Sequence, residues 1–432
     1  MSLRTPIPLV GSSTVAESGV VDPKAVRGEW KYIAFAAAVA VPAIMVRVGA
    51  LEISVEIETL LYGIAILGAA FLLSWGAEVA QLEISQALAI AFLAFVAVLP
   101  EYAVSVVFAW KAGRHPEFAQ FAVANMTGAN RLLIGLGWAT VVIVWWWKSR
   151  EGSVGLKQHG RTDLGFLLIA TLWAFTIPLR HHVSLLDLAV LGTMFVAYVW
   201  RMAQAEPEEP ELVGPPLAVA VLPKNTRRAV TVGLFVVAAG VILAAAEPFA
   251  DGLVTTGQKL HLNQFLLVQW LAPIASEAPE MVVAVLFVLR SKPSAGLGTL
   301  VSSKVNQWTL LIATIPLVYA ISHGGVGALP LDGRQVEEVL LTAAQSVFAI
   351  AVLANLSISR GEAILLLVSF LVQFGFESTA VRYGFSAAYV LAALAVVARD
   401  RQSREGALAA IRDGFRPPWR ARPGAASGGD GD

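Results

Sequence analysis

Two Pro-Glu pairs are the residues of this sequence best suited to chemistry, because each lies in the middle of a long apolar stretch. The first pair is Pro100-Glu101 and the second is Pro279-Glu280. Proline removes a backbone donor and clashes with the carbonyl four residues earlier, so a helix bends or breaks there and frees carbonyl oxygens. In a membrane, such oxygens are tolerated only where protein, water or an ion satisfies them. A carboxylate beside the break therefore predicts a site for a hard cation, Na⁺ or Ca²⁺, or for a proton.

Each pair opens the same longer frame, Pro-Glu-x-x-Val-x-Val-x-Phe, and each frame is followed by a second polar stretch inside an apolar run. The first polar stretch carries Asn125 and Asn130, and the second carries Ser302, Ser303, Asn306 and Gln307. Their side chains either bond between helices or line an ion site, and the pattern alone leaves both possibilities open. Arg131 and Lys304 also fall in these stretches, as possible fixed counter-charges or as residues that reach an interface or internal carbonyl groups.

The composition places these residues in a lipid environment. The chain has 432 residues, of which 57% are hydrophobic and 14% charged, and its mean hydropathy is +0.69. Such a chain cannot cover its surface with polar groups, which excludes a cytosolic enzyme, a nucleic-acid binder and a secreted domain. The 31 basic and 31 acidic residues cancel, and there is no cysteine. We expect no enzyme activity, no cofactor and no protein partner, only the lipid bilayer and small inorganic cations.

Apolar runs of about 20 residues, enough to cross a bilayer, recur along the chain. We place twelve spans, near residues 32–50, 59–80, 84–110, 117–147, 163–180, 184–202, 228–249, 260–290, 294–322, 335–357, 361–377 and 381–398. Most Lys and Arg residues then fall on the side that holds both termini. Because cytoplasmic segments carry this excess, we expect a multi-pass protein of the cell (plasma or inner) membrane with both termini cytoplasmic.

This count makes the two Pro-Glu frames antiparallel, since one span runs outward and the other inward. The expected fold is an all-α polytopic membrane protein of about 12 transmembrane helices, with two inverted five-helix repeats and broken helices at the midplane, an arrangement typical of secondary transporters. The expected divisions are a disordered tail (1–31), an extra span (32–50), a first half (51–202, repeat 82–147), a cytoplasmic linker (203–227), a second half (228–377, repeat 260–322), an extra span (378–398) and a basic cytoplasmic tail (399–432).

With these motifs, the chain resembles the sodium/calcium exchanger family of the cation/calcium exchanger superfamily. That family carries two inverted alpha-repeats, each with a G-T-S-L-P-E-like motif followed one span later by a G-N-x-x-G-S-N-like motif. The resemblance implies ten core helices, a cytoplasmic linker and cation antiport by alternating access. Glu101 and Glu280 match the two central glutamates of the family, and Ser276 falls at the motif threonine.

Several positions depart from the family pattern. Ala97 and Val98 stand where Thr and Ser are expected, Leu133 and Gln307 stand where Asn and Asp are usual, and Lys304 occupies an asparagine position. Glu277 lies at the motif serine, three residues before Glu280 and therefore on the same helical face. We expect Glu101, Glu277 and Glu280 to bind the metal ion, with Ser276, Asn125, Asn130, Ser302, Ser303, Asn306 and Gln307 lining the site.

The expected function is secondary antiport of Ca²⁺ for H⁺ or Na⁺. A monovalent cation (Na⁺)/proton antiporter is the first alternative, because Gln307, Leu133 and Lys304 make the site less anionic. A non-transporting membrane scaffold or sensor with a degraded site is the second alternative.

Overall fold

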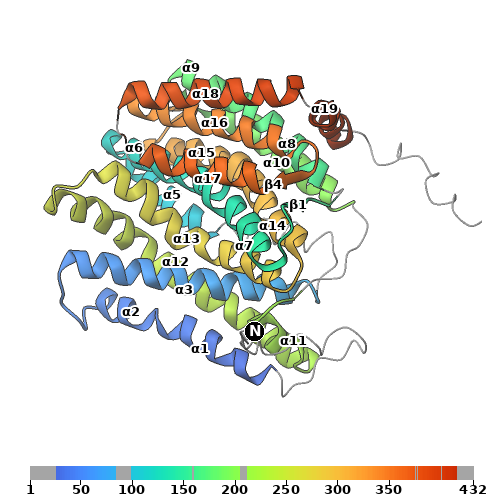
Figure 1. The fold of residues 1–432 in the computed structure, drawn as a ribbon. Coiled ribbons are helices and arrows are strands. Elements are labelled where there is room, and N and C mark those ends of the chain that lie inside the picture. Colours follow the sequence, from blue (N-terminus) through green and yellow to red (C-terminus); the bar gives the residue numbers. More distant parts are fainter. Residues whose placement is uncertain are drawn as a thin grey trace, which may run out of the picture.

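A computed structural model describes residues 26–83, 99–157, 160–204, 212–374, 376, 378–399 and 401–415. Long helices run side by side across the molecule (Figure 1), as expected of a chain whose apolar runs must satisfy their backbone groups internally. The first of them are α1 (Trp30–Ala38), α2 (Val41–Arg47) and α3 (Val55–Ala80).

The rest of the first half is a series of helices with one short strand before α8 and another before α10. Its elements are α5 (Leu99–Ala112), the 3₁₀ turn η2 (Pro116–Phe118), α6 (Ala119–Leu132), the π-helix η3 (Leu133–Trp138), α7 (Ala139–Ser149), β1 (Ser153–Gly155), α8 (Gly160–Ala174), α9 (Thr176–Arg180), β2 (His182–Val183) and α10 (Leu185–Met202).

The second half follows a short helix, α11 (Pro215–Ala220), which lies inside the expected linker. Its elements are α12 (Lys224–Lys259), α13 (Gln264–Leu289), α14 (Pro293–Asn306), the π-helix η4 (Gln307–Leu311), α15 (Ile312–His323), β3 (Leu329–Pro330), α16 (Gly333–Leu353), β4 (Ser357–Ser359), α17 (Arg360–Phe374), α18 (Thr379–Arg399) and α19 (Arg401–Phe415).

Within the described residues, ten helical segments are long and apolar enough to span a membrane by length and composition, so the chain is a multi-pass membrane protein. The predicted count of twelve membrane spans is not confirmed. For the expected span 84–110, the structure describes only α5, and for 361–377 it gives α17, which has 15 residues. The expected basic tail, residues 399–432, contains a helix, α19, which packs against α8.

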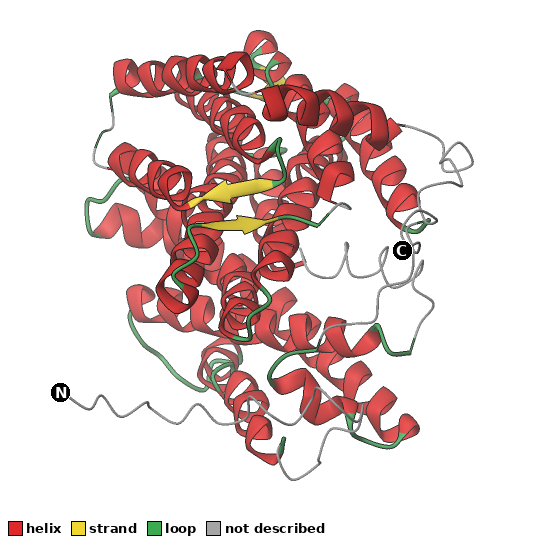
Figure 2. Ribbon diagram, turned by 45° about the vertical axis from the view of Figure 1, so that its right-hand side comes forward, coloured by secondary structure: helices red, strands yellow, loops and turns green. Residues whose placement is uncertain are grey.

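Two short antiparallel strand pairs join the halves at opposite ends of the bundle. β1 pairs with β4, with Ser153 opposite Ser359, and β2 pairs with β3, with His182 opposite Pro330. One of these ladders is visible between the helices in Figure 2. Each ladder takes one strand from each half, so the two halves are tied together at the β1–β4 end and again at the β2–β3 end.

Helix α12 packs along α3, and together with α1 and α2 they form one edge of the bundle, opposite α16 and α18 (Figure 1). The close approach depends on glycine, because a Cβ at Gly252 would lie 2.2 Å from Thr59 Oγ1. Hydrogen bonds add to the packing, since the Thr59 and Thr256 hydroxyls are 3.2 Å apart. We call α3 and α12 the paired-helix body.

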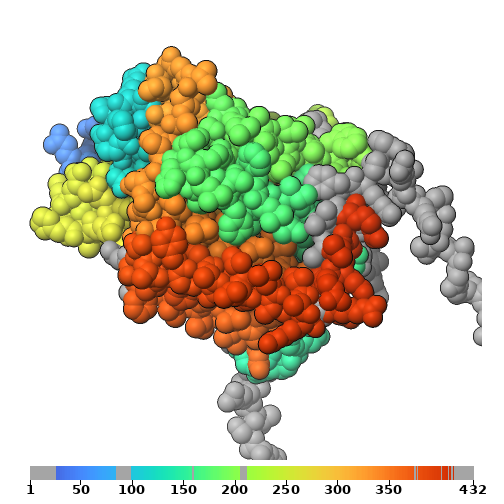
Figure 3. Space-filling view, turned by 90° about the horizontal axis from the view of Figure 1, so that it is seen from above, coloured from blue at the N-terminus to red at the C-terminus, as the bar shows by residue number. Residues whose placement is uncertain are grey.

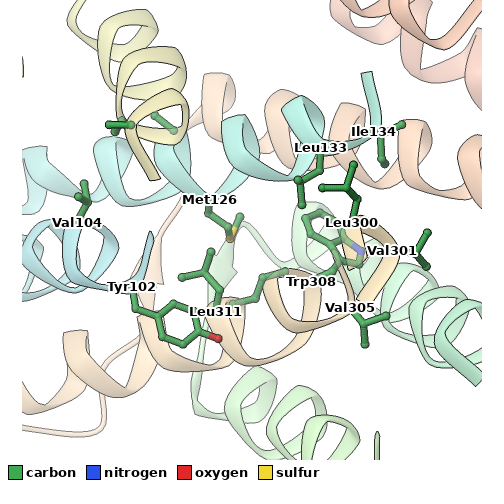
Figure 4. Packing of buried hydrophobic residues seen from close by; sticks show 14 of the residues in the cluster. Tyr102, Val104, Met126, Leu133, Ile134, Leu300, Val301, Val305, Trp308 and Leu311 are labelled. Atoms are coloured by element: carbon green, nitrogen blue, oxygen red, sulfur yellow. The ribbon is translucent and has the colours of Figure 1, made fainter. Parts of the chain in front are cut away.

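Helices α5–α10 and α13–α19 form a second body. Seen from above (Figure 3), the C-terminal helices, in orange and red, cover one flank beside the green helices α8–α10. The interior holds large buried side chains, and in Figure 4 Trp308 lies among Leu133, Leu300 and Val305. The apolar packing around these residues holds α6, α14 and the two π-helices in place at the centre.

Candidate ion-binding site

Glu101 lies at the start of α5, directly after Pro100, and its side chain is enclosed by polar groups from both halves. Asn125 of α6 donates from Nδ2 to Glu101 Oε1 at 2.9 Å, and also to Ser105 Oγ at 2.8 Å. From the second half, Ser276 of α13 donates to Glu101 Oε2 at 2.6 Å. Glu101 is only 1% exposed. Its two carboxyl oxygens therefore accept from neutral donors and not from a cationic side chain.

Glu277 and Glu280 lie on α13, which contains Pro273 and Pro279. Gln307, the first residue of the π-helix η4, donates from Nε2 to Glu277 Oε1 at 2.7 Å. Glu280 lies beside Ser303 and within electrostatic range of Glu101. Glu277 is 2% exposed and interacts electrostatically with both other carboxyl groups. The structure thus gathers the three predicted glutamates around the meeting point of α5, α6, α13 and α14.

Several buried oxygens in and beside this cluster make no hydrogen bond within the described part of the chain. They are Oε2 of Glu277, Oε2 of Glu280, Oδ1 of Asn125, Oδ1 of Asn306, Oε1 of Gln307 and Oγ of Ser303. Buried polar atoms are nearly always satisfied, and these atoms are all possible acceptors. Carboxylate, amide and hydroxyl oxygens are the ligands that Ca²⁺ and Na⁺ take. The unsatisfied acceptors therefore suit a hard cation.

The described residues contain no group of three or more His, Cys, Asp or Glu side chains arranged to hold a metal ion. Two of the three glutamates accept from neutral donors instead: Glu101 from Asn125 and Ser276, and Glu277 from Gln307. A cation that used all three carboxylates would need these donors to be displaced or the helices to shift. It stays a prediction that Glu101, Glu277 and Glu280 together bind the metal ion.

The two helices that carry most of the other predicted site residues, α6 and α14, have the same length and end in the same way. α6 and α14 are each 14 residues long, and each continues directly into a π-helix, at Leu133 and at Gln307. Single π-helical turns of this kind are frequent at functional sites. Superposing the two helix starts makes Asn130 the counterpart of Lys304, and Leu133 the counterpart of Gln307.

Lys304 is completely buried and contacts neutral groups. Its Nζ donates to Asn130 Oδ1 at 2.7 Å and to the Asn130 carbonyl at 3.3 Å, and it lies 4.3 Å from the centre of the Trp308 ring. Asn130 Nδ2 donates to the Met126 carbonyl at 2.8 Å. The Asn130 amide oxygen therefore faces Lys304, and the ammonium group lies within electrostatic range of Glu277.

The sequence suggested Arg131 as a possible counter-charge at the ion site, but the structure places its guanidinium elsewhere. Its guanidinium pairs with Glu338 of α16 at 2.5 Å, donates to Gln373 Oε1 at 2.6 Å and lies over the Trp270 ring. Gln269 donates to the same Glu338 carboxylate at 2.9 Å. The positive charge of Arg131 is thus balanced by Glu338, away from the three glutamates, which the sequence could not indicate because the partner lies 207 residues later.

Ser302 also points elsewhere, since its hydroxyl lies 3.3 Å from Asp163 Oδ2 on α8. Asn306 is buried beside Gln307. Leu133 is packed in the apolar core near Trp308 (Figure 4). Ala97 and Val98 lie outside the described residues.

Ser105 is a site residue that the sequence reasoning missed. It is 1% exposed and accepts from the same Asn125 amide that bonds Glu101. Its position four residues after Glu101 on one helix face was the available signal, because residues so spaced are neighbours on a helix.

A cavity of about 340 Å³ lies between α2, α3 and α12, lined in part by Arg47, Glu58, Glu247 and Asp251. Asp251 pairs with Lys111 at the end of α5, which links the paired-helix body to the second body. Every residue that lines the cavity belongs to α2, α3 or α12, so the cavity lies beside the paired-helix body.

Comparisons with known proteins agree on one family. The model of the family described as sodium/calcium exchanger protein matches residues 58–203 and 230–377. Among solved structures, the crystal structure of the H⁺/Ca²⁺ exchanger CAX is 42% identical, with a TM-score of 0.86 over 90% of this chain and 98% of that one. A search of curated proteins finds no match.

Two more distant structures share the fold. Native YfkE is 14% identical with a TM-score of 0.56, covering 84% of this chain and 100% of that one. The sodium-calcium exchanger NCX_Mj is 18% identical with a TM-score of 0.51, covering 75% and 99%. CAX, YfkE and NCX_Mj therefore share the fold of this chain.

Proposed function

The chain belongs to the sodium/calcium exchanger family, and from this premise we propose that it is a secondary antiporter that exchanges Ca²⁺ for H⁺ or Na⁺ by alternating access, with H⁺ as the favoured counter-ion. The observation that carries the proposal is the set of buried, unsatisfied acceptor oxygens around the three glutamates. Acceptors without donors are what a site for a cation needs.

The glutamate environment favours H⁺ over Na⁺ as counter-ion. Three carboxyl groups within electrostatic range, buried in a low-dielectric interior, cannot all stay charged without cations or protons. A carboxyl group that releases Ca²⁺ can accept a proton in its place. The 42% identical relative is an H⁺/Ca²⁺ exchanger, which supports the same choice here.

Alternating access would follow from movement of the paired-helix body against the second body. Links within the paired-helix body support its motion as a unit, because Lys259 pairs with Glu56 at 3.6 Å and Arg227 and Arg228 pair with Glu83. The second body is braced by the strand ladders at both ends. Sliding at the joint would expose the glutamates to one side and then to the other.

We place the protein in the cell membrane with the β1–β4 end cytoplasmic. Most basic side chains gather at that end, including Lys148, Arg227, Arg228 and Arg360, as the positive-inside rule expects. Both chain termini would then be cytoplasmic. Small inorganic cations and lipid are the partners we infer.

The test is Ca²⁺ uptake by purified protein in liposomes, driven by an imposed pH gradient or by an imposed Na⁺ gradient. We expect uptake with the pH gradient, loss of at least tenfold in Glu101→Gln and Glu280→Gln, and normal uptake in Glu117→Gln, whose side chain is exposed. Unchanged flux in the Glu101 and Glu280 variants would overturn the site.

The same liposomes separate the other candidates. Proton-coupled Na⁺ flux without Ca²⁺ flux would establish the monovalent antiporter. Absence of any cation flux, together with no stabilisation of the protein by Ca²⁺, Na⁺ or pH, would establish a non-transporting protein.

A further inference from the structure

The ammonium group of Lys304 lies where the two inverted repeats meet. Asn130 and Lys304 occupy equivalent places on α6 and α14, and they contact each other directly, Nζ to Oδ1 at 2.7 Å. In the first repeat this place holds an amide oxygen, and in the second it holds a cationic side chain. The contact between them is therefore one between a cation and a ligand oxygen.

The groups around the Lys304 Nζ atom are of the kinds that bind a monovalent cation. Two oxygens of Asn130 face it, one amide and one main-chain carbonyl, and the face of the Trp308 ring lies on another side at 4.3 Å. Carbonyl oxygens and an aromatic face both attract positive charge. Within the described part of the chain no carboxylate pairs with Lys304 directly, although Glu277 lies within electrostatic range.

We propose that the Lys304 ammonium group fills a monovalent cation site formed by Asn130 and Trp308, as a tethered cation that lets the neighbouring glutamates bind Ca²⁺ without free Na⁺. This inference rests on the proposed function for the identity of the ion at the glutamates.

Charge balance gives the tethered cation its role. The two positive charges of one Ca²⁺ and the one of Lys304 together balance Glu101, Glu277 and Glu280. If the ammonium group is removed, one negative charge stays uncompensated in a buried site, where isolated charge is costly. A free monovalent cation must then enter beside Asn130 before Ca²⁺ binds tightly.

The experiment measures Ca²⁺ binding to purified full-length protein by calorimetric titration, once in NaCl and once in choline chloride at equal ionic strength. Choline is too large to enter a site shaped for an ammonium group. We expect wild-type affinity to be the same in both salts. Lys304→Gln should bind Ca²⁺ at least tenfold more weakly in choline and recover in Na⁺. Lys292→Gln is the matched control, because Lys292 is exposed at the start of the same helix.

Equal affinity of Lys304→Gln in the two salts would overturn the inference. If Lys304→Gln does not fold in either salt, Asn130→Asp provides the same test with the lysine retained. The new carboxylate would pair with the ammonium group and cancel its charge while the lysine still fills the site, so Ca²⁺ should bind at least tenfold more weakly in both salts. Wild-type Ca²⁺ affinity of Asn130→Asp in both salts would likewise overturn the inference.

Failure of this inference is distinguishable from failure of the proposed function. A wild-type protein that binds no Ca²⁺ in either salt contradicts the proposed function. Wild-type binding that Glu101→Gln abolishes, combined with a salt-independent Lys304→Gln, retains the antiporter and rejects only the tethered cation.

Discussion

Ser276 of the second half donates its hydroxyl hydrogen to Glu101 of the first half, with 2.6 Å between Oγ and Oε2. The two residues are 175 positions apart in the chain. This bond crosses between α13 and α5 at the glutamate cluster, so it couples the position of one proline-containing helix to that of the other.

We expect Ser276→Ala to destabilise the protein and to weaken Ca²⁺ transport. The variant leaves one oxygen of a buried carboxyl group without its donor, which costs about 1–3 kcal/mol. Thermal unfolding in detergent and Ca²⁺ uptake in liposomes measure the two effects. Ser276→Thr keeps the hydroxyl and should restore both. Thr193→Ala is the control, because Thr193 bonds only within its own exposed helix face. Wild-type uptake by Ser276→Ala would argue against a role for this bond in transport.

The sequence predicted the helical class, the inverted repeat and the two central glutamates, because these depend on local patterns. Proline in mid-helix and a buried acid are visible in the residues themselves. The family match and the 42% identical structure confirm the predicted fold class, whereas the role of the two glutamates stays a prediction.

The partners of the charged residues could not be predicted in the same way. Arg131 finds Glu338 and Ser302 faces Asp163, and both pairings join helices far apart in the chain. No local sequence feature distinguishes Glu338 from other acidic residues near the start of a helix. The same limit applies to Asn130 and Lys304, whose contact depends on how the repeats cross.

We expect Glu338→Gln to be among the most destabilising single changes in the protein. It would leave Arg131 buried and without its anion, and removal of one partner of a buried ion pair costs about 3–5 kcal/mol. The loss should appear in thermal unfolding. Ca²⁺ affinity of the folded fraction should stay near that of the wild type, because Arg131 does not balance the ion site. A large drop in affinity at unchanged stability would contradict this assignment.

The ion pairs that Glu83 forms should stabilise the folded protein to an extent that depends on pH. The side chains of Arg228 and Arg227, just after the linker, hold the pKa of Glu83 below its ordinary value of 4.5. A carboxyl group with a lowered pKa in the folded protein stabilises it above the unfolded pKa, and this contribution is lost as the pH falls through the folded pKa.

Glu83→Gln should therefore lower the thermal stability at neutral pH and have a progressively smaller effect as the pH falls below about 4.5. Unfolding temperatures of wild type and variant across that pH range measure the difference. Glu117→Gln, at an exposed position, should show no comparable pH dependence. An equal effect of Glu83→Gln at neutral and acidic pH would show that its bonds to the arginines are not electrostatic in origin.

Movement of the paired-helix body against the second body can be tested by cross-linking, because the chain has no cysteine of its own. Lys111 and Asp251 contact each other across the joint, whereas Thr59 and Thr256 contact each other within the paired-helix body. We expect a short bifunctional thiol reagent to stop Ca²⁺ uptake by the Lys111→Cys/Asp251→Cys variant. The Thr59→Cys/Thr256→Cys variant, cross-linked by the same reagent, should continue to transport. If linked Lys111→Cys/Asp251→Cys protein transports at the unlinked rate, the two bodies do not slide at this joint during exchange.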